Sequence, residues 1–177
     1  MRAVTRRPPV GAAALLRLAP VPRFNNVSLK EKKVPLTWSH SIDNLDWEEL
    51  SALFEACPPM GNKRACDLRL AFGSSMFRCF VHDGGKLVGV ARALADGVYI
   101  AYIGDIAVLP AYRGIGLGKA IVAELLRLCA GHKKIILYSV PGSEAFYRQF
   151  GFRGMRTAMA IFENQDVAMQ RGYVDTA

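Results

Sequence analysis

Three glycines in one short stretch, Gly114, Gly116 and Gly118, are the residues of this sequence best suited to binding a ligand. Glycine has no Cβ, so backbone N–H groups beside it can approach a ligand closely, and the N-terminus of a following helix favours negative charge. Arg113 and Lys119 add positive charge on either side of the turn. The stretch therefore predicts a turn that binds a diphosphate.

Two common phosphate-binding turns do not match this stretch. A Walker loop ends in Gly-Lys followed by Ser or Thr, whereas Ala120 follows Lys119. A dinucleotide-binding turn needs Gly-x-Gly-x-x-Gly close behind its first strand and an acidic residue about 20 residues later, and neither requirement is met. The remaining alternative to an anion site is a strand-to-helix turn whose glycines serve only packing.

Longer motifs connect the turn to a known family. The spacing Arg-x-x-Gly-x-Gly, which starts at Arg113, resembles the acetyl-CoA signature of the GNAT superfamily of N-acetyltransferases. The phrases Val-Leu-Pro-Ala-Tyr-Arg-Gly at 108–114 and Ala-Phe-Tyr-Arg-Gln-Phe-Gly-Phe at 145–152 are typical of the same family. The resemblance covers residues 34–165. Within the superfamily, the segment 141–148 is most similar to plastid-type acetyltransferases of plants and algae, including serotonin N-acetyltransferases.

The resemblance implies an N-acetyltransferase that uses acetyl-CoA as its co-substrate and needs no metal. An acceptor amine would attack the thioester directly. The implied acceptor is a small arylalkylamine, a protein lysine or a protein N-terminus. The alternative from another class is a non-catalytic acyl-CoA-binding regulatory module.

The resemblance also implies where acetyl-CoA binds. In the family, the strand before the glycine turn and the next parallel strand splay apart, and the pantetheine arm enters the gap. On this model the N–H of Val108 donates to the acetyl oxygen, which is an oxyanion-hole role. The implied cofactor residues are Ile106, Ala107, Val108, Arg113, Gly114, Ile115, Gly116, Leu117, Gly118, Lys119, Ser143 and Tyr147.

Two side chains are candidates for proton transfer. The family places a tyrosine at the position of Tyr147 to protonate the departing CoA thiolate; the alternative is an aromatic side chain that only packs. Many relatives carry an asparagine shortly before this tyrosine, and here that contact is lost or passes to Ser143. Asp105 could order a water that relays the amine's proton, or could hold a neighbouring loop. Tyr102 lies three residues earlier and competes for the same pocket if a bulge resets the strand's alternation.

The remaining chain predicts the elements that hold these residues. We expect a single α/β (α+β) domain: a mixed, mostly antiparallel sheet with a central parallel splayed strand pair and flanking helices. Expected strands cover 36–40, 77–82, 86–94, 98–108, 134–139 and part of 152–162. Expected helices cover 45–56 (capped by Asp43 or Asn44), 63–72 (stopped by Gly73), 115–130 (stopped by Gly131) and a short segment capped by Ser143.

The positive charge is concentrated at the N-terminus. Residues 1–33 contain eight Lys or Arg and one acidic residue, whereas the rest of the chain is nearly balanced, with 15 basic and 14 acidic residues. This composition predicts an organellar transit peptide, chloroplast rather than mitochondrion, although serine is scarce; the alternatives are a disordered basic arm and a cytoplasmic protein. We therefore expect a leader at 1–33, the domain at 34–165 and a tail at 166–177.

The composition also limits the partners. No apolar run approaches the length of a membrane span. The four cysteines are scattered, which predicts neither a zinc site nor a disulfide framework. The three histidines, His40, His82 and His132, are expected at the surface or in the core. We expect acetyl-CoA and an amine as partners, no specific nucleic acid and no membrane, and a monomer or homodimer.

Overall fold

A five-stranded sheet organises residues 35–175, the part of the chain that the computed structural model describes. The strands are β1 (Thr37–Ser39), β2 (Phe77–Asp83), β3 (Lys86–Ala95), β4 (Ile100–Val108) and β5 (Lys134–Ile136), and they lie in this order across the sheet. The helices are α1 (Trp47–Glu55), α2 (Ala65–Gly73), α3 (Leu117–Leu128), α4 (Glu144–Arg148) and α5 (Gln165–Gln170), with a 3-10 turn η1 at Pro110–Tyr112. The expected leader at 1–33 lies outside the described residues.

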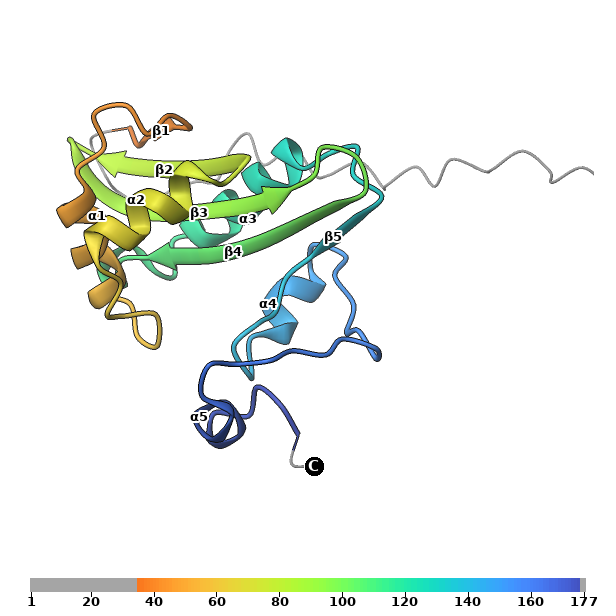
Figure 1. Cartoon of the computed structure of the whole chain (residues 1–177). Helices are drawn as coiled ribbons and strands as arrows, with labels where there is room; N and C mark the ends of the chain where they lie inside the picture. The colour runs from red at the N-terminus through yellow and green to blue at the C-terminus, as the bar shows by residue number, and fades with distance from the viewer. Residues whose placement is uncertain (1–34, 176–177) are drawn as a thin grey trace, which may run out of the picture.

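The sheet is antiparallel from β1 to β4, and β5 runs parallel to β4. The β2–β3 hairpin turns at Gly84 and Gly85, whose φ angles are 57° and 91°. Two consecutive residues with positive φ form the turn that matches the twist of a two-residue hairpin, as the sequence predicts. The crossover from β4 to β5 passes through α3, which covers one face of the sheet (Figure 1).

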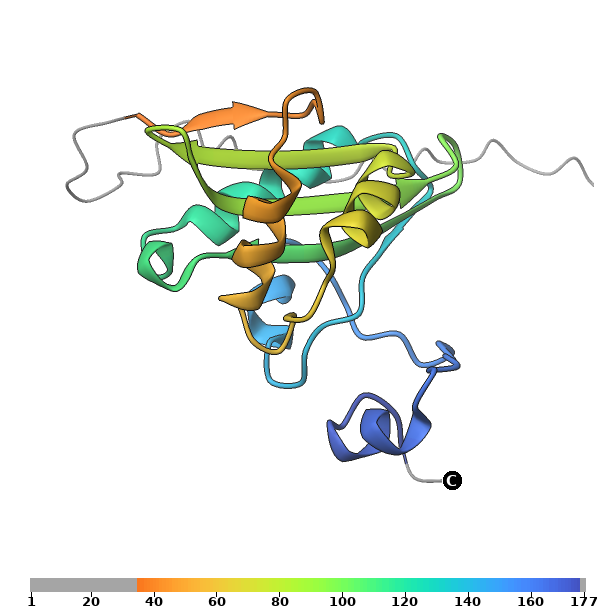
Figure 2. The same ribbon diagram turned by 60° about the vertical axis from the view of Figure 1, so that its left-hand side comes forward.

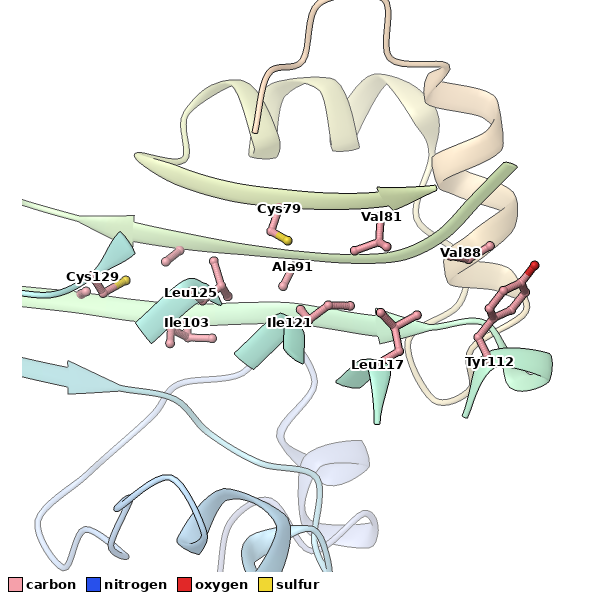
Figure 3. Packing of buried hydrophobic residues seen from close by; sticks show 12 residues of the cluster. Cys79, Val81, Val88, Ala91, Ile103, Tyr112, Leu117, Ile121, Leu125 and Cys129 are labelled. Carbon is pink, nitrogen blue, oxygen red and sulfur yellow. The ribbon is translucent and has the colours of Figure 1, made fainter. Parts of the chain in front are cut away.

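The helices divide between the two faces of the sheet. Helices α1 and α2 cover one face, and α3 covers the other, as the two views together show (Figures 1 and 2). The core between α3 and the strands is built from small and branched side chains, among them Ala91, Ile121 and Leu125 (Figure 3). A Cβ on Gly89 would lie 2.7 Å from a terminal methyl of Ile121, so the absence of a side chain at Gly89 lets α3 pack close to β3.

Several details differ from the sequence expectations. Asp46 is the N-cap of α1, since its carboxylate accepts from the N–H groups of Glu48 and Glu49, so the expected cap at Asp43 or Asn44 is wrong. Helix α2 runs through Gly73 and is capped by Ser74. Ser143 is at the N-cap position of α4, but its side chain makes no capping bond.

The sheet ends earlier than the sequence predicts. Residues 152–162 form no strand, and β5 has three residues, so the parallel pair β4–β5 lies at an edge of the sheet and not at its centre. The chain from α4 onward, including α5, lies beyond this edge (Figure 1). Among residues 35–175, no helix is long and apolar enough to cross a membrane.

Candidate functional site

Strand β4 carries a bulge in front of its last three residues. Val90 and Arg92 are two residues apart on β3, but their partners on β4, Ala107 and Gly104, are three residues apart. The extra residue is Asp105, whose φ of 52° lies in the left-handed region. A bulge of this kind reverses the in-and-out alternation that follows it.

The burial pattern shows that reversal. Ala101 and Ile103, before the bulge, pack in the core under α3, whereas Ala107, after it, packs in the core under α1 and α2. In a regular strand all three side chains would lie on one face. The bulge also brings Tyr102 and Asp105 to the same face, which is the condition under which the sequence allows Tyr102 to compete for the pocket.

The end of β4 turns two peptide groups away from β3. The N–H of Leu109 donates to the Val88 carbonyl at 3.0 Å, and Val108 pairs with Gly89. Since antiparallel pairs alternate between bonded and non-bonded, the peptide groups of Ile106 and Val108 point to the other side. Ala107 belongs to a bonded pair, so its peptide groups face β3 and not the expected thioester position.

The side of β4 that these two groups face carries no strand in the described structure. Strand β5 pairs only with Ile100–Tyr102, and then diverges from β4 (Figure 1). The Val108 carbonyl accepts from Arg113 Nε at 3.1 Å and from Cys57 Sγ at 3.3 Å. This leaves two N–H donors, those of Ile106 and Val108, directed at an open edge.

The glycine turn joins this edge to the N-terminus of α3. Gly114 and Gly116 have φ angles of 78° and 92°, and Gly116 is the N-cap. The first intrahelical bond runs from the Ala120 N–H to the Gly116 carbonyl at 3.1 Å, and no side chain caps the helix. The N–H groups of the first turn therefore point out of the helix end, where the helix dipole favours an anion.

Three more of the predicted cofactor residues, Ile115, Leu117 and Lys119, lie in this turn or in the first turn of α3. Leu117 is buried in the α3 core, Ile115 is half-buried and Lys119 is exposed. A Cβ on Gly118 would lie 3.8 Å from Phe146 and 3.9 Å from Val108, which brings the end of β4, the first turn of α3 and helix α4 together.

Tyr147 lies on α4, the helix that reaches this junction. Its ring contacts those of Phe146 and Phe152, with centroids 5.0 and 6.2 Å away. Burial raises the pKa of its phenol, so the hydroxyl stays protonated at neutral pH. Within the described chain the hydroxyl has no hydrogen-bond partner, so its proton is available to a ligand.

Asp105 is held between two cations that the sequence analysis did not single out. Lys63 bonds to its Oδ1 and Arg92 Nε to its Oδ2. Burial alone would raise the pKa of this carboxyl, but the hydrogen bonds and charges of Lys63 and Arg92 outweigh burial and lower it. Lys63 and Arg92 are 42 and 13 residues away in sequence, so no local motif connects them to Asp105.

A second concentration of side chains lies on the same face, beside β5 and the C-terminal segment. Four rings contact one another in sequence-distant pairs, with centroid separations of 6.0–6.5 Å. We call Tyr102, Tyr138, Phe162 and Tyr173 the aromatic cluster. They line a cavity of about 820 Å³. Burial is the main cause that raises the pKa of Tyr102 to about 12.

The histidines and cysteines lie apart from this site. His40 Nε2 is 2.8 Å from Glu124 on α3, and His132 is buried with Nδ1 against the Cys129 carbonyl. All four cysteines are free. Among residues 35–175, no group of three or more His, Cys, Asp or Glu side chains is placed to hold a metal ion.

Comparison with known families gives one match that covers most of the chain. The model of the acetyltransferase (GNAT) family matches residues 41–152. This range includes the bulge, the glycine turn and Tyr147.

The individual relatives that match this chain are also named as N-acetyltransferases. A chloroplastic GCN5-related N-acetyltransferase 1 of Arabidopsis thaliana is 29% identical over 79% of this chain and 72% of its own length. A glucosamine 6-phosphate N-acetyltransferase of Trypanosoma brucei brucei is 34% identical over 64% of this chain and 84% of its own. A chloroplastic serotonin N-acetyltransferase 2 of Oryza sativa is 40% identical, but over 40% of this chain and 36% of its own. Several curated relatives are matched over less than half of their length.

Solved structures show the same fold. A probable acetyltransferase of Staphylococcus aureus superposes with a TM-score of 0.64 at 20% identity, covering 73% of this chain and 99% of that one. An aminoglycoside N-acetyltransferase in complex with CoA superposes with a TM-score of 0.59 at 14% identity, covering 75% and 97%.

Proposed function

This chain belongs to the acetyltransferase (GNAT) family, and we propose that it transfers the acetyl group of acetyl-CoA to a primary amine by direct attack on the thioester. The acceptors that the sequence resemblance implies, a small arylalkylamine or a protein lysine or N-terminus, belong to this proposal. The observation that carries it is the open edge of β4, where the N–H groups of Ile106 and Val108 lie beside the uncapped first turn of α3.

This edge suits a thioester next to a diphosphate. The uncapped N–H groups of α3, approached through Gly114, Gly116 and Gly118, would bind the diphosphate of CoA. Arg113 and Lys119 lie exposed at its rim. An N–H of Ile106 or Val108 would donate to the acetyl oxygen, whose negative charge grows as the amine attacks. Two donors face the edge, so the role that the sequence analysis gave to Val108 alone is shared with Ile106 in this proposal.

The reaction needs one proton removed and one supplied. The C–N bond to the amine forms, the C–S bond to CoA breaks, the amine loses a proton to water, and the CoA thiolate takes one up. Tyr147 would supply that proton, because its phenol is protonated at neutral pH and carries no partner in the described chain.

Asp105 has a supporting role in this proposal. Both of its carboxylate oxygens are engaged, and its lowered pKa makes it a weak base. The sequence leaves two roles open for Asp105: ordering a water that relays the amine's proton, or holding a neighbouring loop. Its contacts favour the second role. Asp105 would hold the segment that carries Lys63 and fix the bulge that directs the Ile106 N–H toward the open edge. Tyr102, with a pKa of about 12, is protonated at neutral pH and accepts no proton from an ammonium group.

Replacement of Tyr147 by phenylalanine tests the proposed proton donor, and amine-dependent turnover by wild type excludes a non-catalytic acyl-CoA-binding module. The ring and its packing remain, so acetyl-CoA affinity measured by calorimetry is expected to change less than threefold. Loss of a proton donor is expected to lower turnover by roughly 100-fold or more. Equal turnover of the two proteins, with chemistry limiting the rate, would remove Tyr147 from the mechanism.

We also propose that residues 1–33 are a leader that directs residues 34–165, the acetyltransferase domain, to the plastid. The basic composition of the leader supports this, as do the names of the Arabidopsis and rice relatives, both of which are chloroplastic.

A further inference from the structure

The aromatic cluster joins parts of the chain that are far apart in sequence. Tyr102 comes from β4, Tyr138 follows β5, and Phe162 and Tyr173 come from the C-terminal segment on either side of α5. Tyr138 is the centre: its ring lies 6.5 Å from Tyr102, 6.3 Å from Phe162 and 6.0 Å from Tyr173. The C-terminal segment therefore contacts Tyr138, which in turn stacks on Tyr102 of the strand that carries the candidate site.

Local bonds hold this segment in place. The Asn164 side chain accepts from the Val167 N–H at 3.0 Å and caps α5, and Ala168 is buried. The Tyr173 N–H donates to the Ala168 carbonyl at 2.9 Å. A Cβ on Gly172 would touch Pro141 at 3.6 Å, which places the end of α5 against the loop between β5 and α4. These bonds orient Tyr173 relative to α5, and its ring lies 6.0 Å from that of Tyr138.

The cavity that the cluster lines is open to solvent and mainly apolar. Met155, Met159 and Ile161 lie at its rim and are exposed by 52%, 99% and 96%. Large apolar side chains gathered at a cavity are typical of a binding site. Among its described lining residues the single charged side chain is Asp175, and no basic side chain lines it. An anionic group would find no counter-charge there, whereas a flat aromatic ring would find other rings to pack against.

The cavity lies within reach of the proposed reaction centre. The bulge brings Tyr102 and Asp105 to the same face of β4, three residues apart. A strand advances about 3.3 Å per residue, so Tyr102 lies on the order of 10 Å from the bulge. A flat ring with a short aminoalkyl chain spans much of that distance. A ring bound beside Tyr102 would therefore place its amine near the bulge, next to the residue that carries the Ile106 N–H.

We propose that the aromatic cluster selects the acceptor: it admits primary amines that carry a flat apolar group and disfavours acceptors that carry a phosphate. The inference rests on the proposed acetyl transfer and narrows its substrate class. The sequence predicts only a tail beyond residue 165. In this proposal the C-terminal segment forms one side of the acceptor site. Phe162 and Tyr173 are its specificity-determining residues.

Steady-state kinetics with three amines test this inference. The probes are 2-phenylethylamine, Nα-acetyl-lysine amide and glucosamine 6-phosphate, each with saturating acetyl-CoA. We expect wild-type kcat/KM for 2-phenylethylamine to exceed that for each of the others by at least tenfold. In Tyr173→Ala we expect KM for 2-phenylethylamine to rise at least tenfold and KM for acetyl-CoA to stay within twofold. Tyr173→Phe keeps the ring and is expected to behave as wild type.

Two further variants control for folding and for surface aromatics. Phe162→Leu keeps apolar volume but removes a flat ring, and is expected to raise the same KM severalfold. Tyr99→Ala removes an exposed tyrosine that lies outside the cavity lining, and is expected to change no constant. Circular dichroism and acetyl-CoA calorimetry on each variant separate a lost fold from a lost acceptor site.

Each other outcome overturns a defined part of the account. Acetylation of 2-phenylethylamine with equal KM in wild type, Tyr173→Ala and Phe162→Leu overturns the inference and leaves the proposed function intact. A wild-type preference for the lysine amide or the sugar phosphate does the same. A dimer in sedimentation that Tyr173→Ala dissociates, with KM unchanged, would assign the cavity to a second copy of the chain. Failure of wild type to acetylate any of the three, with acetyl-CoA bound, overturns the inference; failure on peptide N-termini as well overturns the proposed function.

Discussion

Replacement of Asp105 by asparagine tests the ion pairs that fix the bulge. Asparagine keeps the size of the side chain and tolerates the left-handed φ of 52°, so the change removes the negative charge and little else. Lys63 and Arg92 would then share a site without a counter-charge. Removing one partner of a buried ion pair costs about 3–5 kcal/mol of folding stability.

The partial exposure of the three side chains lowers the expected effect to the bottom of that range or slightly below it. The Asp105 side chain is 12% exposed, but those of Lys63 and Arg92 are 31% and 19% exposed and retain part of their hydration. The amide oxygen of asparagine also remains as an acceptor for one cation. We therefore expect a loss of about 2–3 kcal/mol in the free energy of unfolding at neutral pH.

Urea unfolding of the full chain at pH 7 measures this loss. The matched control is Asp67→Asn, whose partner Arg64 forms an ion pair in which both side chains are more than half exposed. The control is expected to leave the free energy of unfolding nearly unchanged, because water and salt screen an exposed ion pair. A loss for Asp105→Asn no larger than for the control would refute the argument that the pairs hold the bulge.

The same variant has a pH signature with a defined sign. The pKa of Asp105 is lower in the folded protein than in the unfolded chain, so its stabilising effect is complete above the unfolded value of about 4. It disappears as the pH falls from there through the folded pKa. The stability difference between wild type and Asp105→Asn should be constant from about pH 5 to 7 and shrink in acid. A difference that stays constant into strong acid would contradict this assignment.

Three other predictions concern the cofactor turn, the acceptor's proton and the leader. Gly118→Leu, at a helical position without positive φ, should raise the acetyl-CoA Kd at least tenfold by calorimetry, whereas Gly73→Leu on α2 should not change it; equal affinities would remove the turn from the site. The kcat/KM for an amine should rise with pH up to the amine's own pKa, because Asp105 titrates in acid and Tyr102 near 12; a plateau at neutral pH would reveal a base elsewhere. A fluorescent protein carrying only residues 1–33 should enter plastids, and cytosolic fluorescence would contradict the leader.

The glycine turn and the element order up to α4 could be predicted from the sequence, because their signals are local. Glycines between an apolar strand and an amphipathic helix predict the turn, whichever neighbouring strand the apolar strand pairs with. The type of each strand connection also follows from length: the Gly84–Gly85 hairpin is antiparallel, and the α3 crossover is parallel.

The bulge and the ion pairs at Asp105 could not be predicted, because they depend on register. The sequence shows an acidic residue in a strand, but the pairing of Ala107 with Val90 decides which way it faces. The same holds for the missing strand at 152–162. Its apolar residues have the composition of a strand, but β5 ends at Ile136 and offers it no partner, so several of them line the cavity instead.

The most direct test of the account is the release of free thiol from acetyl-CoA by the wild-type protein in the presence of primary amines. The account predicts thiol release that depends on the amine, in a one-to-one ratio with the acetylated amine identified by mass spectrometry. Acetyl-CoA that binds tightly, with no thiol release above hydrolysis for arylalkylamines, lysine peptides and peptide N-termini, would contradict it.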